Sequence, residues 1–313
     1  MEGIIYFGRH TINVDEWRDS SKVLPTLKKL SELMQCISST DYSKSRVPEN
    51  WHEEPESFFD KVQTVLEGQS DLIGQVYSQL FDRAFMTSIS KEKGYLEVRD
   101  DITNNNPNSI GTEYYGAMRL GDEWPDVPSD LHVSSLDEVT SFVIKFLIEH
   151  PQGEASFLSR CKKIFPNLVF APDLEDRLKS HGRPSKDGAV KKKRSRSGAP
   201  KVTGIKGFSK EVTKAFVTLN ELSTDTGTPK EIMHKVKEIS GFECTQEGGN
   251  KAHLQFPFIN NSGQEETINC EFHIKIHNHN TPDGVRYEER VYFGFVHIEH
   301  SRRIMIAHSG QHL

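Results

Sequence analysis

The sequence predicts an α+β protein with a mainly helical N-terminal part, a basic linker, and a C-terminal part of two helices and an antiparallel sheet. Three observations lead to this prediction. Apolar residues recur at helical spacing early in the chain, residues 182–206 lack apolar periodicity, and after two further helical runs the apolar period changes to two. The 313 residues are enough for two domains with separate cores. We therefore expect domains at 1–181 and 207–313, joined by a linker at 182–206.

The net charge of −6 conceals a strong asymmetry along the chain. Residues 1–176 carry a net charge of −13, residues 177–206 carry +10, and residues 207–313 carry −3. Because the basic run is rich in Gly, Pro and Ser, we expect a disordered tether. It would either fold back on the acidic domain or contact the phosphates of a nucleic acid, RNA rather than DNA. The candidate nucleic-acid-binding side chains are Lys191, Lys192, Lys193, Arg194 and Arg196.

The chain shows no feature of a secreted or membrane-spanning protein. Its first ten residues lack the basic and apolar regions of a signal peptide. No run approaches the roughly 18 apolar residues that cross a bilayer. The four cysteines are scattered without a CxxC pair, which is typical of free thiols in a reducing compartment. We expect a cytoplasmic protein without a membrane partner, and no motif calls for a cofactor.

The acidic N-terminal part shows mainly helical periodicity. Helices are predicted near Pro25, at 58–67, at 72–85, from Leu136 and at 173–180. Residues 86–133 are predicted as loops with short strands, and residues 167–172 as a further strand. No phosphate loop, nucleophile elbow or HExxH motif occurs in residues 1–176. We therefore expect a recognition or control domain that binds a protein partner.

The C-terminal part changes from helical to strand periodicity. One predicted helix begins at Ser209, and a second begins at Thr228-Pro229 and ends at Gly241. The apolar alternation that follows predicts an antiparallel meander. Its five predicted strands are 242–246, 253–258, 267–279, 286–298 and 303–307.

The register of the long hairpin at 267–298 follows from its apolar residues. If Ile274 lies opposite Val291, the apolar faces of both strands merge into one core. The other face then pairs His277 with Glu288, Lys275 with Arg290, and His273 with Tyr292. Imidazoles, cations and a phenol would thus share one face of the sheet.

Such a face carries the groups that RNA cleavage requires. The reaction needs a base for the 2′-hydroxyl, an acid for the leaving oxygen, and cations for the charged phosphorane. Eight of the 14 histidines also fall in the last 61 residues. The candidate catalytic residues are His253, His273, Lys275, His277, Arg290 and Tyr292.

The helix at 229–239 and the segment GFECTQEGGNKAHLQF at 241–256 resemble the start of HicA-type mRNA interferases. That family consists of small toxins with a double-stranded-RNA-binding-domain-like fold. The resemblance implies RNA as the substrate and a catalytic role for His253. The family's usual Gly-Ser-His is replaced here by a longer segment, and strands stand where its closing helix is expected.

A looser resemblance connects the two helices and the sheet with RelE/HigB-like toxins. It is carried by Arg290-Val291-Tyr292-Phe293 and by Ile304–His308, which stand where that family has its last strands. This resemblance also implies RNA as the substrate, but it places the active residues differently.

A metal site is the main chemical alternative. His277 and His279 lie on one side of a predicted strand, about 6–7 Å apart along it. Zinc accepts such imidazole pairs, and Glu288 or His273 could complete the set of ligands. Our main interpretation is nevertheless metal-free.

The sequence therefore favours a toxin- or defence-type protein whose C-terminal module binds RNA, with RNA cleavage as a further hypothesis. Whether the chain is an enzyme stays open at this point. A non-enzymatic adaptor that binds nucleic acid or a protein in a larger assembly is the second hypothesis, and a metal-dependent hydrolase is the third.

Overall fold

The structure is a computed structural model. It describes residues 2–40, 42–48, 57–80, 89–90, 94–104, 113–121, 123–183, 203–248, 251–260, 263–280, 286–298 and 301–313. The chain divides into two compact units, Met1–Lys145 and Phe146–Leu313. None of the described helices has the length and apolar character needed to cross a membrane.

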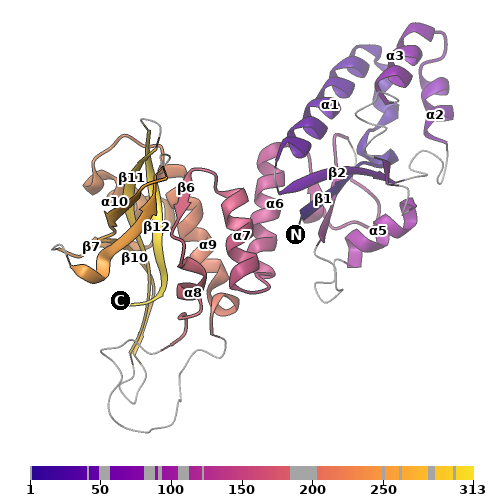
Figure 1. The fold of residues 1–313 in the computed structure, drawn as a ribbon. Coiled ribbons are helices and arrows are strands. Elements are labelled where there is room, and N and C mark those ends of the chain that lie inside the picture. The colour runs from indigo at the N-terminus through magenta and orange to yellow at the C-terminus, as the bar shows by residue number, and fades with distance from the viewer. Residues whose placement is uncertain are drawn as a thin grey trace. The chain divides into compact units, whose positions relative to one another are not determined.

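Unit 1 is built on a parallel sheet of five strands in the order β3-β2-β1-β4-β5 (Figure 1). The strands are β1 (Glu2–Tyr6), β2 (Ser43–Pro48), β3 (Ile89–Ser90), β4 (Glu113–Met118) and β5 (His132–Val133). Parallel neighbours need crossover connections, and helices supply them here. This strand order is typical of doubly wound α/β sheets.

The helices of unit 1 lie between its strands in the sequence, except the last one, which follows β5. They are α1 (Val23–Ser39), α2 (Phe58–Val65), α3 (Ser70–Leu80), α5 (Tyr95–Asn104) and α6 (Leu136–Glu149), which contains the division between the units. Single 3₁₀ turns occur at Arg9–Thr11, Val14–Arg18, Ser20–Lys22 and Ser129–Leu131. Pro25 lies in the first turn of α1, as predicted.

The prediction of a mainly helical N-terminal part includes short strands within residues 86–133, where β3, β4 and β5 lie, but it lacks β1, β2 and the assembly of all five strands into one parallel sheet. The five strands are only two to six residues long, and their hydrogen-bond partners lie tens of residues away in the sequence. A short apolar run such as that of β1 has no periodicity of its own, so local pattern cannot separate it from a helical turn.

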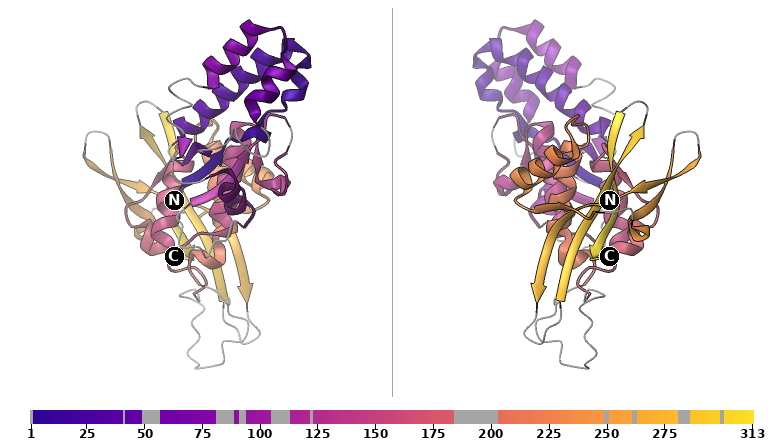
Figure 2. Two further views of the ribbon diagram at one scale, coloured as in Figure 1. Left: turned by 90° about the vertical axis from the view of Figure 1, so that its right-hand side faces the viewer. Right: turned by 90° about the vertical axis from the view of Figure 1, so that its left-hand side faces the viewer.

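Unit 2 contains a second sheet, in the order β6-β12-β11-β10-β7. Its strands are β6 (Leu168–Phe170), β7 (Glu243–Gln246), β10 (Phe272–Asn280), β11 (Arg286–Ile298) and β12 (Ser301–Gln311). Only β6 joins in parallel, at the edge of β12. Figure 2 shows the long strands β10, β11 and β12 side by side.

The predicted five-stranded meander is therefore wrong in its connections. β7 pairs with β10 instead of the strand that follows it in the sequence. The intervening β8 (Gln255–Ile259) and β9 (Glu265–Asn269) pair with each other as a separate hairpin, which the 3₁₀ turn Ala252–Leu254 precedes. Alternation of apolar residues identifies strands but does not identify their partners.

The helices of unit 2 are α7 (Glu154–Ile164), α8 (Leu174–Leu178), α9 (Ile205–Leu222) and α10 (Pro229–Ser240). At α10 the predicted start at Thr228-Pro229 and end at Gly241 are confirmed, and Gly241 has φ of 72°. The structure adds a capping box between Thr228 and Glu231. The predicted start of α9 is wrong. Ser209 lies inside this helix, where its hydroxyl donates to the Ile148 carbonyl at 2.6 Å.

The core of unit 2 also corrects the domain boundaries. Phe216 of α9 packs against Phe157, Phe165 and Phe170, with ring centroids 5.6 to 6.3 Å apart. Residues 146–181, which we expected in the first domain, thus belong to unit 2. Of the expected linker, residues 184–202 lie outside the described residues, and α9 begins at Ile205.

The predicted register of the long hairpin is confirmed over its central part. Ile274 faces Val291, and the pairs Lys275/Arg290 and His273/Tyr292 follow. A β-bulge between Lys275 and His277 then shifts the pairing, so that His277 faces Glu289 instead of Glu288. A bulge adds one residue to a strand and moves the following side chains to the other face.

Candidate functional site

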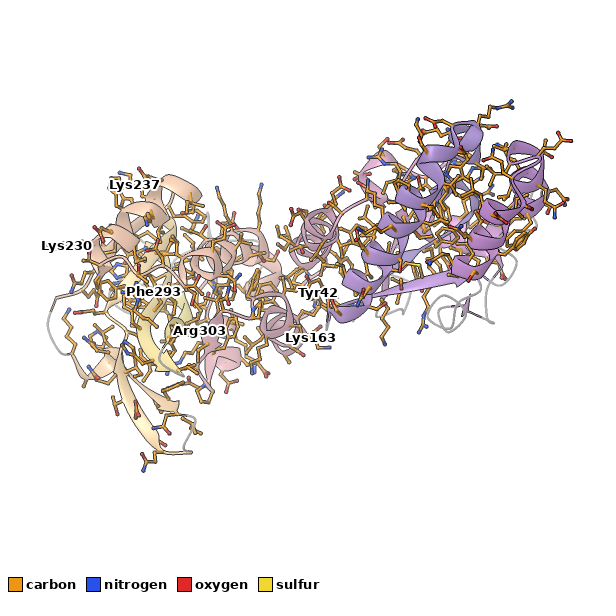
Figure 3. The ribbon with its side chains drawn as sticks, turned by 90° about the horizontal axis from the view of Figure 1, so that it is seen from above. Tyr42, Lys163, Lys230, Lys237, Phe293 and Arg303 are labelled. Carbon is orange, nitrogen blue, oxygen red and sulfur yellow. The ribbon has the colours of Figure 1, made fainter. Side chains whose placement is uncertain are left out.

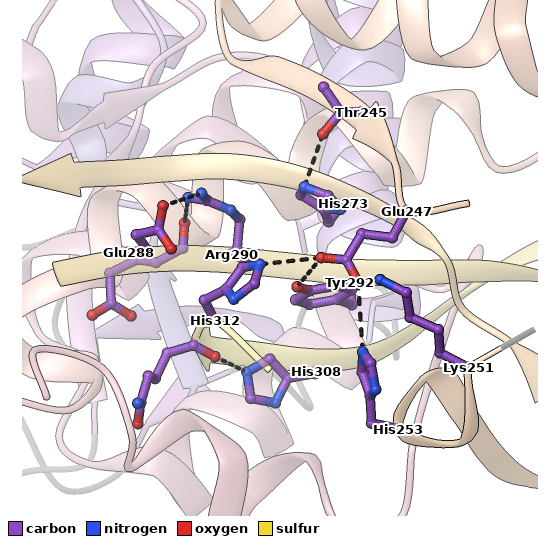
Figure 4. A network of polar contacts seen from close by, with 12 residues as sticks. Thr245, Glu247, Lys251, His253, His273, Glu288, Arg290, Tyr292, His308 and His312 are labelled. Atoms are coloured by element: carbon purple, nitrogen blue, oxygen red, sulfur yellow. Dashed lines mark hydrogen bonds and ion pairs between the residues drawn. The ribbon is translucent and has the colours of Figure 1, made fainter. Parts of the chain in front are cut away.

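A carboxylate at the end of β7 collects several polar side chains around it (Figure 4). The Oε1 atom of Glu247 lies 3.1 Å from His312 Nε2 and accepts a hydrogen bond from the Tyr292 hydroxyl at 3.4 Å. Its Oε2 atom lies 3.6 Å from His253 Nε2 and 3.7 Å from Lys251 Nζ. We call these five residues the Glu247 cluster.

Solvent reaches one side of the Glu247 cluster. The side chains of His253 and Lys251 are 47% and 49% exposed, and that of His312 is 25% exposed. Glu247 itself is largely buried between them. The two imidazoles are therefore accessible to a ligand, while the carboxylate that joins them is shielded.

A row of polar side chains crosses the sheet next to the cluster. Tyr292 on β11 lies between His273 on β10 and His308 on β12, with ring centroids 5.0 and 5.7 Å away. His273 Nε2 lies 2.8 Å from Thr245 Oγ1, and His308 Nε2 lies 2.7 Å from the Gln311 carbonyl. The three ring side chains are at most 5% exposed, so this row belongs to the interior of the unit.

Burial fixes the charge states within this row. It lowers the pKa of His273 to about 4, and the positive charge of Arg290 acts in the same direction. Burial also lowers the pKa of His308 to about 3. Both imidazoles are consequently neutral near pH 7. Burial raises the pKa of Tyr292 far above its ordinary value, so the phenol stays protonated and donates to Glu247.

The pKa of Glu247 is lowered in spite of its burial. Burial alone would raise it, but the positive charges of His273, His312 and Lys251 outweigh this effect. Because burial keeps His273 neutral near pH 7, its charge does not act on Glu247 there. The Lys251 ammonium group and the hydrogen bond of His253 still lower the pKa of Glu247. Glu247 is thus an anion that can orient two imidazoles.

The six predicted catalytic residues do not all converge. His253 and Tyr292 lie in the Glu247 cluster, and His273 lies beside it. His277 is separated from them, because the bulge places its ring 5.9 Å from that of Phe208 on α9.

The two predicted cations of the sheet each have a carboxylate partner. Lys275 Nζ lies 3.0 Å from Glu243 Oε2. Arg290 is buried, and its Nη2 atom lies 3.0 Å from Glu288 Oε1. Neither is an unpaired cation that is ready to meet a phosphate.

The side chain of one predicted metal ligand and all of the predicted nucleic-acid-binding lysines and arginines lie outside the part of the chain that the structure describes. Within the described residues, no group of three or more His, Cys, Asp or Glu side chains could hold a metal ion. The side chain of His279 is outside the described set, so the His277/His279 pair stays a prediction. The same holds for the linker residues, which lie within 184–202: Lys191, Lys192, Lys193, Arg194 and Arg196.

The sequence analysis missed three members of the cluster, namely Glu247, Lys251 and His312. The sequence contains a weak indication of this group, because an acidic residue, a lysine and a histidine (Glu247, Lys251 and His253) lie close together on both sides of a glycine pair. Only the pairing of β7 with β10, however, brings this turn beside Tyr292 on β11. Such a pairing cannot be derived from local spacing.

A second polar group has the connectivity of a Ser-His-acid triad. His181 Nδ1 lies 2.8 Å from Glu289 Oε2, and its Nε2 lies 3.0 Å from Ser309 Oγ. Glu289 also accepts the Gly182 N–H at 2.8 Å. Since all three side chains are fully buried, no substrate reaches this serine. The group anchors the chain at His181 to β11 and β12.

The place where doubly wound sheets bind ligands is filled in unit 1. That place lies beyond the carboxyl ends of β1 and β4, where the strand order reverses. The Trp124 indole N–H and the Thr11 hydroxyl both donate to the Met118 carbonyl, at 3.0 and 2.9 Å. A Cβ atom on Gly8 would lie only 2.6 Å from the Trp124 ring. Among the described residues of unit 1, Trp124 thus occupies this place.

Comparisons with family models, with curated proteins and with solved structures find no match for this chain. The resemblances to HicA-type and RelE/HigB-like toxins accordingly stay predictions.

Proposed function

We propose that the C-terminal unit binds RNA and cleaves it without a metal ion, with the Glu247 cluster as its reaction centre. The observation that carries this proposal is the Glu247 carboxylate, which has two partly exposed imidazoles within 3.6 Å and an ammonium group at 3.7 Å. Acid–base cleavage of a phosphodiester needs such a combination. The resemblance of residues 229–256 to HicA-type interferases supports His253 as one of the acting groups.

In the proposed reaction, His253 accepts the proton of the ribose 2′-hydroxyl, and O2′ forms a bond to phosphorus. The bond from phosphorus to O5′ breaks, and His312 donates a proton to O5′. The products are a 2′,3′-cyclic phosphate and a 5′-hydroxyl end. Glu247 orients both imidazoles, while Lys251 neutralises charge on the phosphorane oxygens.

The cellular role that fits this reaction is that of a toxin- or defence-type protein of the cytoplasm. Free RNA is the substrate that such a protein meets there, and the four cysteines are free thiols. The acidic unit 1 would bind a protein partner that controls the nuclease. The alternative is a metal-dependent hydrolase. A chelator would stop cleavage by such an enzyme but would not stop the metal-free reaction proposed here.

The test is RNA cleavage by the purified chain, combined with growth arrest on expression. We expect His253→Ala and His312→Ala each to slow cleavage by roughly 10²–10⁴-fold, because each removes one acid–base group. His234→Ala is the matched control. This exposed histidine on α10 lies 3.4 Å from a carboxylate, that of Glu238, but it does not belong to the Glu247 cluster. Cleavage that survives in both cluster variants, or that stops with chelator, would contradict the proposal.

One observation favours the adaptor as a second candidate. The polar face around Tyr292 is mostly interior, because His273, Arg290 and His308 are at most 5% exposed. Buried polar networks of this kind serve to specify a fold as well as to perform chemistry. An adaptor would bind RNA or a protein with unchanged affinity in the His253→Ala and His312→Ala variants and would show no cleavage in the parent.

A further inference from the structure

Helix α9 carries a row of lysines along its exposed side. Lys206, Lys210 and Lys214 follow at intervals of four residues, which places them on one face, about 6 Å apart along the axis. All three are exposed. The opposite face of α9 is buried through residues such as Phe208 and Phe216, so the lysines cannot turn inward.

Within the described part of the chain, the three lysines of the α9 row have no ion pairs, whereas some other lysines of unit 2 do. Lys235, Lys251 and Lys275 each lie near a carboxylate. Among the residues that the structure describes, no carboxylate forms an ion pair with any lysine of the α9 row. Cations without counter-charges produce a positive surface potential, which attracts polyanions.

An aromatic ring adjoins the row, and the neighbouring helix α10 carries further exposed lysines. The Lys214 ammonium lies 5.3 Å from the ring centre of Phe242, which is half-buried between α10 and β7. Lys230 and Lys237 on α10 are exposed as well (Figure 3). Proteins bind single-stranded nucleic acids through such combinations: the cations contact the phosphates, and the aromatic ring stacks on a base.

We infer that Lys206, Lys210, Lys214 and Phe242 form a binding surface for single-stranded RNA. The three ammonium groups contact successive phosphates of an extended strand, and the Phe242 ring contacts one base. This inference rests on the proposed function for the choice of RNA as partner. It adds a binding surface made of residues that do not belong to the Glu247 cluster.

The experiment measures the salt dependence of RNA binding by the full chain. A short fluorescent oligouridylate is the probe, and every protein carries His253→Ala so that cutting of the probe is slow during the binding measurement. The triple variant Lys206→Gln, Lys210→Gln, Lys214→Gln is compared with a control of equal charge change, Lys29→Gln, Lys162→Gln, Lys163→Gln, at exposed positions elsewhere. Loss of three phosphate contacts should make the slope of log K against log salt shallower by about 2.

We expect this change in the α9 variant alone, and a smaller loss of affinity without a change of slope in Phe242→Leu. Equal slopes in the α9 variant and the parent would overturn the inference and leave the proposed function intact. A parent that neither binds nor cleaves RNA would overturn both. Equal changes in the α9 variant and in the control would reduce the effect to net charge, which also overturns the inference. Preference for duplex over single strand would contradict the role of Phe242.

Discussion

At the level of single residues, burial divides the histidines of unit 2 into two groups. His253 and His312 reach solvent beside Glu247. His273 and His308 are enclosed by the sheet and are held neutral. The same side-chain type therefore occurs both at the solvent-exposed edge of the sheet and in its interior.

The buried pair gives a prediction for stability against pH. The folded chain protonates His273 only near pH 4, whereas an unfolded chain does so near pH 6.5. Because the unfolded state binds this proton first, the free energy of unfolding falls as the pH drops from 6.5 to 4, by ~3 kcal/mol for this group. Urea unfolding across this range measures it. His273→Gln should remove this contribution and make the curve shallower, while the contribution of His308 and of the other groups remains. His234→Gln should leave the slope unchanged, and a parent curve without a slope there would contradict the assignment.

At the level of elements, local pattern was sufficient wherever neighbours in the sequence are partners in space. The start of α10 at Thr228-Pro229, its end at Gly241 and the pairing of Ile274 with Val291 all follow from nearby residues. The bulge before His277 was not predictable, because one extra residue leaves the apolar pattern almost unchanged. The cluster around Glu247 depends on long-range pairing, so the sequence provided only His253 and Tyr292 of its members.

The capping box provides a prediction at this level. Thr228→Ala removes the hydroxyl that accepts the Glu231 N–H, and it should lower the free energy of unfolding of unit 2 by ~1 kcal/mol. Thr226→Ala, in the exposed turn before α10, is the control and should change stability little. The measurement is chemical denaturation followed by circular dichroism. Equal stability of both variants would show that the cap contributes nothing.

At the level of the whole molecule, the division of the chain differs from the one that charge and composition suggest. The basic run 182–206 falls inside unit 2, since β6 and the phenylalanines before it pack with α9 and β12 after it. The charge of a segment predicts its interactions with solvent and with polyanions, but it does not predict which segments pack into the same core.

Truncation tests this division directly. A fragment of residues 146–313 should fold and unfold cooperatively, because it retains the full sheet and core of unit 2. A fragment of residues 207–313 lacks β6 and the three rings that cover Phe216, so we expect it to be unfolded or aggregated. Thermal unfolding followed by circular dichroism compares them. A stable fragment 207–313 would restore the boundary that the sequence suggested.

The central claim is metal-free cleavage of RNA at the Glu247 cluster, and the chemistry of the products tests it most directly. The purified chain is incubated with RNA in the presence of a chelator, beside the same oligonucleotide with a single 2′-deoxyribose at the cleavage position. We predict 2′,3′-cyclic phosphate and 5′-hydroxyl ends from the RNA and no cleavage at the deoxy position, because O2′ is the nucleophile. Cleavage at the deoxy position, or an RNA that stays intact under every condition including added metal, would contradict the account.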